Sequence, residues 1–140
     1  LPIKKFFFAS TQLVSSLGTF TEGHCYRPDT CYGSSKVISE FIVQSFFAGR
    51  DSFYCIFRPT TVWGPGCSAH YQNFFRKLSR SSYIHPSTKN HFKSFSFIFN
   101  AVHQLASLSL SKTFPPSQVI YLCDYDPIEL YNWSNLLANS

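Results

Sequence analysis

Tyr32 and Lys36 are the two residues whose types and spacing most directly suggest chemistry. They are four positions apart, and the apolar residues that follow recur at helical spacing, so both side chains should leave the same face of one helix. An ammonium beside a phenol favours the phenolate, which brings a group with an unperturbed pKa of about 10 closer to acting as a base at neutral pH. The pair is therefore a candidate proton-transfer centre, although Tyr and Lys also meet at this spacing by chance in many helices.

The length and composition of the chain indicate one folded unit with a real core. It has 140 residues, of which 44% are hydrophobic, and it contains no Met and begins with Leu. We therefore expect a fragment or a processed piece of a longer protein. No run approaches the roughly 18 to 20 consecutive apolar residues of a membrane span, so we expect a cytoplasmic protein without a membrane partner.

The charges and cysteines narrow the possible partners. A net charge of +5 suits anionic partners of any kind, but the basic residues are scattered and many aromatic residues sit at core-like positions, so we expect no nucleic acid. Five cysteines without a Cys-x-x-Cys spacing indicate a reducing compartment. His24-Cys25 and Cys67 with His70 would bind a metal only if the fold brought them together, so no metal site is expected.

A strand, a long helix and a second strand are predicted for the first part of the chain. The apolar run Ile3 to Ala9 reads as a buried strand, residues 31–48 as a helix ended by Gly49, and Phe53 to Phe57 as the next strand. This order predicts a βαβ unit with parallel strands. Thr11 follows the first strand, where open α/β sheets bind ligands, although by itself a simple strand-ending turn is the better explanation.

Shorter and more polar elements are expected after residue 66. The pattern predicts a helix from Tyr71 to Leu78, an alternating strand from Lys93 to Phe99 and a helix that Asn100 caps. A strand from Val119 to Cys123 and a helix from Ile128 to Asn139 complete the chain.

Four separated segments carry motifs of a known family. They are Phe6 to Val14, Tyr32-Gly33-Ser34-Ser35-Lys36 with Glu40, the loop Arg58-Pro59-Thr60-Thr61-Val62-Trp63-Gly64-Pro65-Gly66, and Val119 to Trp133. In this order they resemble the extended short-chain dehydrogenase/reductase family, in particular its NAD-dependent sugar-nucleotide epimerases and dehydratases. The resemblance spans nearly the whole chain, yet it covers only about the second half of such an enzyme.

The resemblance implies a role for each matching residue. Tyr32 would be the base and Lys36 would lower its pKa, and both would also contact the cofactor, while Thr11 would be the catalytic hydroxyl that orients the substrate oxygen. Two residues, Pro59 and Val62, would border the nicotinamide of NAD, with NADP not excluded. The substrate-binding residues implied are Thr11, Thr61 and Lys93.

Three departures from the family pattern limit this reading. Lys93 stands where many members have Arg, and it keeps the charge but loses the planar fork for bidentate phosphate binding. Asn100 stands where the family has an acid. The Gly-rich turn that binds the dinucleotide pyrophosphate is absent, because the six glycines are scattered.

We therefore predict a Rossmann-like doubly wound α/β fold with a small substrate lobe. Residues 1–66 would be the C-terminal part of the NAD-binding domain, and residues 67–140 an incomplete substrate-binding lobe. The expected function is that of a fragment of an NAD-dependent epimerase/dehydratase acting on a nucleotide sugar, and a homodimer of the full-length parent stays open. The alternatives are a hydroxysteroid-type or other small-alcohol dehydrogenase, and a non-catalytic remnant or interaction module with an exposed sheet edge.

The missing Gly-rich turn leads to a direct prediction. The chain by itself should bind NAD poorly or not at all, and turn nothing over, because the pyrophosphate lacks its helix N-terminus and backbone donors. Isothermal titration with NAD measures this affinity, and micromolar binding by the isolated chain would contradict the prediction.

Overall fold

The computed structural model describes residues 4–15, 26–80, 92–113 and 118–138. The elements in chain order are β1 (Lys5–Ala9), η1 (Gln12–Val14), α1 (Cys31–Phe47), β2 (Phe53–Pro59), β3 (Thr61–Trp63), α2 (Ala69–Ser79), β4 (Phe92–Lys93), β5 (Phe95–Phe97), α3 (Ile98–Leu110), β6 (Gln118–Leu122), β7 (Ile128–Glu129) and α4 (Leu130–Ala138).

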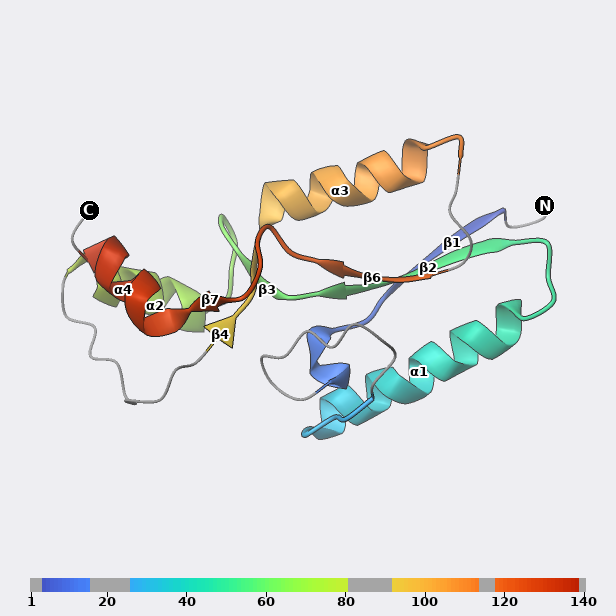
Figure 1. The fold of residues 1–140 in the computed structure, drawn as a ribbon, viewed down its shortest axis with the longest axis horizontal. Coiled ribbons are helices and arrows are strands. Elements are labelled where there is room, and N and C mark those ends of the chain that lie inside the picture. Colours follow the sequence, from blue (N-terminus) through green and yellow to red (C-terminus); the bar gives the residue numbers. More distant parts are fainter. Residues whose placement is uncertain (1–3, 16–25, 81–91, 114–117, 139–140) are drawn as a thin grey trace.

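A three-stranded parallel sheet in the order β1-β2-β6 forms the centre of the fold (Figure 1). Ala9, at the end of β1, aligns with Phe57 of β2, and Pro59, at the end of β2, aligns with Leu122 of β6. The predicted parallel βαβ unit is therefore confirmed. The middle residues of β1 are half-buried rather than buried on both faces, because β1 is an edge strand of the described sheet.

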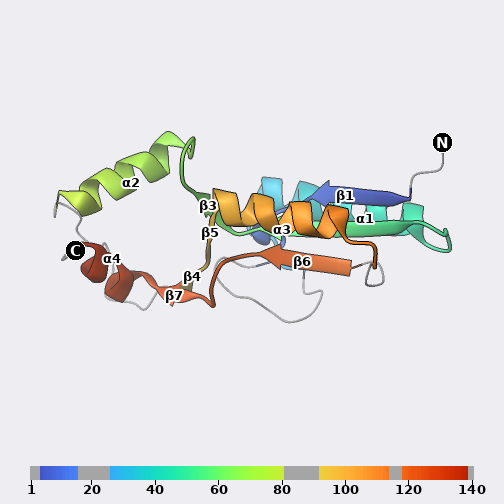
Figure 2. The same ribbon diagram turned by 90° about the horizontal axis from the view of Figure 1, so that it is seen from above.

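Helices cover both faces of this sheet. Helix α1 lies below it and α3 above it in Figure 1, and the view from above in Figure 2 agrees. Val43 and Phe47 of α1 pack on Ile56 of β2, which is fully buried. The ring of Phe6 lies 5.2 Å from that of Phe47, and partly buried apolar residues on β1, β2 and β6 surround the cluster. This arrangement confirms the predicted doubly wound α/β class.

A smaller α/β group of elements lies beyond the carboxyl ends of β1, β2 and β6 (Figure 1). It contains the parallel pair β3-β5, the antiparallel pair β4-β7, and helices α2 and α4, which pack on each other. Trp133 of α4 is its centre, because the rings of Phe74 and Phe95 stack on it at 6.1 and 4.7 Å.

Strand β6 links the two parts of the molecule. It comes from residues 67–140, yet it pairs with β2 from residues 1–66 and completes the central sheet. The division of the chain at residue 66 into a cofactor part and a substrate part stays a prediction about function, while the sheet itself crosses that point.

The predicted start of α3 is wrong. The helix begins at Ile98, and the residue before it, Phe97, makes no side-chain cap, so Asn100 lies inside the first turn. Instead, the carboxylate of Asp124 accepts a hydrogen bond of 2.6 Å from the Phe97 backbone N–H. A carboxylate from a distant residue thus stabilises the positive end of the helix, and the strand ends at Phe97 rather than Phe99.

Pro59 lies within a central strand, although a strand ending at Phe57 was predicted. The backbone N–H of Thr60 donates to Leu122 on the β6 side, and successive N–H groups of a strand point to opposite sides. The Pro59 nitrogen therefore faces the side of β1, whose pairing has already ended at Ala9. The missing N–H costs no ladder hydrogen bond there, which explains why proline is tolerated.

Candidate functional site

The amino end of α1 carries the Tyr32 and Lys36 pair. The Thr30 hydroxyl accepts a hydrogen bond of 3.0 Å from the Gly33 backbone N–H and begins the helix one residue before Cys31. Gly33 faces η1 so closely that a Cβ there would lie 2.2 Å from the Leu13 carbonyl oxygen. Glycine at this position therefore lets the Tyr32 end of the helix approach the segment that follows β1.

Lys36 connects this helix to the end of β1. Its Nζ donates a hydrogen bond of 3.0 Å to the carbonyl oxygen of Ala9, the last residue of the strand. The same nitrogen lies 5.9 Å from the centre of the Tyr32 ring and 5.2 Å from that of Phe8. Tyr32 is 53% exposed, so its phenol is accessible beside the ammonium. The spacing in the sequence thus corresponds to two side chains near the carboxyl end of β1.

Thr11 begins η1 two residues after that strand. Its side chain accepts a hydrogen bond of 3.3 Å from the Leu13 backbone N–H, and the residue is buried. This local bond fixes the hydroxyl two residues after Ala9, whose carbonyl Lys36 contacts. Both interpretations of Thr11, as a turn residue and as a site residue, agree with this placement.

A cavity of about 520 Å³ lies where the central sheet meets the smaller group of elements. Its lining residues are Thr11, Gln12, Leu13, Thr60, Thr61, Val62, Tyr71, Phe92, Lys93 and Leu130. The structure therefore brings together four of the residues singled out in the sequence, namely Thr11, Thr61, Val62 and Lys93. Tyr32, Lys36 and Pro59 are not among the lining residues.

Tyr71 is a cavity residue that sequence analysis missed. Lys93 Nζ donates a hydrogen bond of 3.0 Å to the Tyr71 phenol oxygen, and it lies 5.1 and 5.8 Å from the ring centres of Tyr71 and Phe95. Burial raises the pKa of the Tyr71 phenol, but hydrogen bonds with Lys93 and Thr61 and the charge of Lys93 outweigh it, so that pKa is lowered. No local sequence signal marks Tyr71, because its partners come from two other elements.

A buried ion pair lies between α1 and β2, next to the site. Arg58 and Glu40 are 1% and 0% exposed, and their closest atoms, Nη2 and Oε2, are 2.7 Å apart. A second bond of 3.0 Å from Arg58 Nε to Glu40 Oε1 makes the pair bidentate. The Ser10 hydroxyl also donates to Glu40. The pair therefore ties α1, the end of β2 and the residue before Thr11 to one another.

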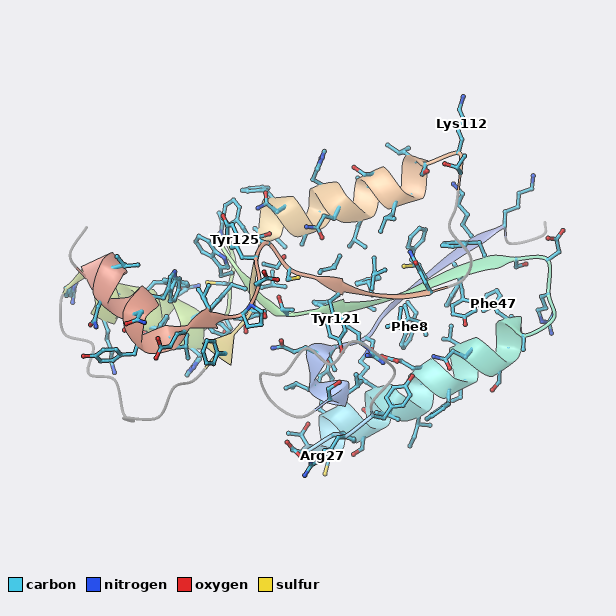
Figure 3. All side chains as sticks on the ribbon, in the orientation of Figure 1. Phe8, Arg27, Phe47, Lys112, Tyr121 and Tyr125 are labelled. Atoms are coloured by element: carbon cyan, nitrogen blue, oxygen red, sulfur yellow. The ribbon has the colours of Figure 1, made fainter. Side chains whose placement is uncertain are left out.

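Two tyrosines enclose this pair. Tyr26 donates to Glu40 over 2.8 Å, and Arg58 donates over 2.9 Å to Tyr121, which extends from β6 near η1 (Figure 3). The guanidinium carbon lies 5.2 and 5.4 Å from the two ring centres. Burial alone would raise the pKa of the Glu40 carboxyl, but its hydrogen bonds, led by those from Arg58, lower it below the ordinary value.

The sequence contains a signal for this pair. Glu40 stands four residues after Lys36, among apolar residues of a helix, and Arg58 directly follows an apolar strand. Charges in such positions are almost never fully buried unless paired. An acid on the helix and a base at the end of the next strand could therefore have been predicted to pair.

Metal ligands and membrane spans receive no support in the described part of the chain. No three residues of the types that bind metals gather there, and His24 and Cys25 lie outside it. Cys31, Cys55, Cys67 and Cys123 are free thiols. None of the described helices is both long and apolar enough to cross a bilayer.

Comparison with protein families gives one match. The model of the NAD dependent epimerase/dehydratase family matches residues 1–85. No curated protein matches the chain significantly.

Solved structures match over nearly the whole chain. MoeE5 in complex with UDP-glucose and NAD is 21% identical, with a TM-score of 0.74, over 97% of this chain and 48% of its own. UDP-N-acetylglucosamine 4-epimerase from Bacillus cereus is 21% identical, with a TM-score of 0.73, over 95% of this chain and 48% of its own. UDP-glucuronic acid 4-epimerase from Bacillus cereus in complex with UDP-glucuronic acid and NAD is 17% identical, with a TM-score of 0.78, over 99% of this chain and 46% of its own. At these identities the likeness concerns the fold, and the chain spans about half the length of these structures.

The buried pair generates a prediction about stability. Replacing Glu40 by Gln leaves the Arg58 charge buried and unpaired, so the free energy of unfolding at pH 7 should fall by about 3–5 kcal/mol. The folded-state pKa of Glu40 is lowered, so its carboxylate contributes fully to the free energy of unfolding above the ordinary carboxyl pKa of about 4.3. This contribution disappears as the pH falls through the folded-state pKa. The difference between wild type and variant should therefore shrink in acid.

Urea denaturation at several pH values measures both effects. Asp51→Asn, at an exposed turn residue, is the matched control and should change the free energy of unfolding by no more than about 0.5 kcal/mol. An unchanged stability of Glu40→Gln at pH 7 would show that the pair does not hold the site together.

Proposed function

The chain belongs to the NAD dependent epimerase/dehydratase family, and we propose that it forms the catalytic and substrate-binding part of an enzyme that alters a nucleotide sugar by transient hydride transfer. One observation carries the proposal. The cavity beyond the carboxyl ends of the sheet gathers Thr11, Thr61 and Lys93, two hydroxyls and a cation suited to a hydroxylated and anionic ligand. UDP-glucose and UDP-glucuronic acid, the ligands bound in solved structures of similar fold, are of this chemical kind.

The residues beside the cavity fit a nicotinamide dinucleotide. Lys36 is half-buried and uses one of its three N–H donors on the Ala9 carbonyl, which leaves donors for ribose hydroxyls. Pro59, at the end of β2, and Val62, in β3, are half-buried apolar residues whose surface suits one face of the nicotinamide ring. When bound, NAD would accept a hydride from a sugar carbon and return it.

The chain's own residues would handle the proton. Tyr32 would take the proton of the sugar hydroxyl as hydride leaves the same carbon, and the Lys36 ammonium favours the phenolate that this requires. The Thr11 hydroxyl would donate a hydrogen bond to the sugar oxygen and stabilise charge that develops there. Thr61 and Lys93 would contact the rest of the substrate, with Lys93 at the nucleotide diphosphate.

A hydroxysteroid or other small-alcohol dehydrogenase would use the same Tyr and Lys pair. The two hydroxyls and the cation in the cavity favour the nucleotide sugar, because a steroid has no anionic group for Lys93 and few oxygens for the hydroxyls. A non-catalytic remnant or interaction module is the outcome if no nucleotide sugar binds.

Binding of UDP-glucose to the chain tests the substrate class. Isothermal titration should give saturable binding, and Lys93→Ala should weaken it by about tenfold, because a charge-assisted contact to the diphosphate is lost. Lys112→Ala is the control, since this exposed side chain extends from the end of α3 away from the cavity (Figure 3). Equal losses for both variants, or no binding by wild type, would contradict the proposal.

The role of Tyr32 is testable in a protein that joins this segment to a Gly-rich dinucleotide-binding half. Tyr32→Phe should lower turnover of a nucleotide sugar by at least about 100-fold and leave NAD affinity within about twofold, because only the proton acceptor is removed. Tyr131→Phe, at 51% exposure against 53% for Tyr32, is the matched control and should keep full turnover. Wild-type turnover of Tyr32→Phe would remove this residue from the mechanism.

A further inference from the structure

Three residues from separate elements meet on one side of the cavity. Tyr71 comes from α2, Lys93 from β4 and Thr61 from β3, and all three line the cavity. The Lys93 ammonium donates to the Tyr71 oxygen over 3.0 Å, and Thr61 lines the same cavity. The smaller group of elements thus contributes a preformed polar contact to the cavity wall.

Lys93 has a charge that no acid of the described residues neutralises. Its recorded contacts are the Tyr71 oxygen and the faces of the Tyr71 and Phe95 rings. A phenol accepts the hydrogen bond without cancelling the charge, so the ammonium stays available for an anion. Two of its three N–H donors remain after the bond to Tyr71.

A lysine alone is a poor holder of a diphosphate. Its ammonium is a point charge on a flexible stem, whereas an arginine presents a rigid planar fork that matches two phosphate oxygens. Binding of an anion to a mobile lysine also loses the conformational entropy of that stem, which weakens the affinity. The bond to Tyr71 and the two rings order the Lys93 stem before a ligand arrives.

We propose that Tyr71 is a positioning residue that holds the Lys93 ammonium in the cavity, so that this lysine can bind the diphosphate of a nucleotide ligand as an arginine would. The inference rests on the proposed function and adds a residue to it. Tyr71 acts through Lys93 and touches no reacting atom. The lowered pKa of the Tyr71 phenol agrees with an ammonium held against it.

Other ionisable groups near Tyr71 do not replace Lys93 in this role. The elements packed around it carry Glu129 on β7 and Tyr131 on α4, while α2 itself carries His70, Arg76 and Lys77. His70 contacts the Tyr71 ring at 5.4 Å between centres, edge to face. Among the charged groups that the structure describes, only Lys93 acts on the Tyr71 phenol through both a hydrogen bond and its charge.

Titration of UDP-glucose into a set of variants tests the proposal. Tyr71→Phe should weaken binding by about five- to tenfold, yet have almost no effect in a Lys93→Ala background, because the tyrosine acts through the lysine. Lys93→Arg should restore wild-type affinity to Tyr71→Phe, since the guanidinium fork needs no phenol to orient it. Tyr125→Phe, at a 71% exposed residue outside the cavity, is the control and should bind as wild type does.

A measurement without ligand separates positioning from a general effect on folding. The near-ultraviolet difference titration between wild type and Tyr71→Phe isolates the ionisation of the Tyr71 phenol. Lys93→Ala should move this ionisation to higher pH, whereas a merely structural tyrosine would titrate equally in both backgrounds. Far-ultraviolet circular dichroism establishes that each variant is folded.

Each outcome decides between the two proposals. If Tyr71→Phe weakens UDP-glucose binding equally in the wild-type and Lys93→Ala backgrounds, the role of Tyr71 is overturned and the proposed function stays intact. The same conclusion follows if Lys93→Arg does not restore the affinity of Tyr71→Phe. Binding of inorganic pyrophosphate but not UDP-glucose, with the predicted dependence on both residues, supports Tyr71 and overturns the nucleotide sugar. Failure of wild type to bind either probe overturns both.

Discussion

The bidentate ion pair between Glu40 and Arg58 is the interaction on which the rest of the site depends. It is almost fully buried, and it joins helix α1 to the central strand β2. Buried charges are costly unless they are paired and fully hydrogen-bonded, and here Ser10, Tyr26 and Tyr121 complete the contacts. Because such a pair tolerates little displacement, α1 is held in one position along the sheet. The Tyr32 and Lys36 pair at the start of α1 is fixed with it.

The cavity lies at the boundary between two packed regions. One is the parallel sheet with its two helices, centred on Ile56, and the other is the smaller group of elements around Trp133. Apart from Tyr71 on α2, the polar residues that line the cavity lie at strand ends or in the segment that follows β1. A site with two hydroxyls and a cation thus adjoins two apolar regions.

Lys93 illustrates how a departure from a family pattern can be compensated by tertiary contacts. It lacks the planar fork of an arginine, but its ammonium lies against the Tyr71 phenol and two aromatic faces, and our proposal is that these contacts fix its position for a diphosphate. The same principle operates at α3, where the carboxylate of Asp124 supplies the helix start that Asn100 was expected to cap. In both places a distant side chain performs a function that local sequence could not reveal.

The sequence by itself determined the order of the main elements and the placement of Tyr32 and Lys36 on one helix, because hydrophobic period and residue spacing act within a single element. It also indicated Thr11, Thr61 and Lys93 through resemblance to a family. Tertiary structure alone decided that Thr11, Thr61 and Lys93 share a cavity, that Lys93 donates to Tyr71, and that Glu40 pairs with Arg58. Those contacts join residues far apart in the chain, and their formation depends on how whole elements pack, which no local pattern of residues encodes.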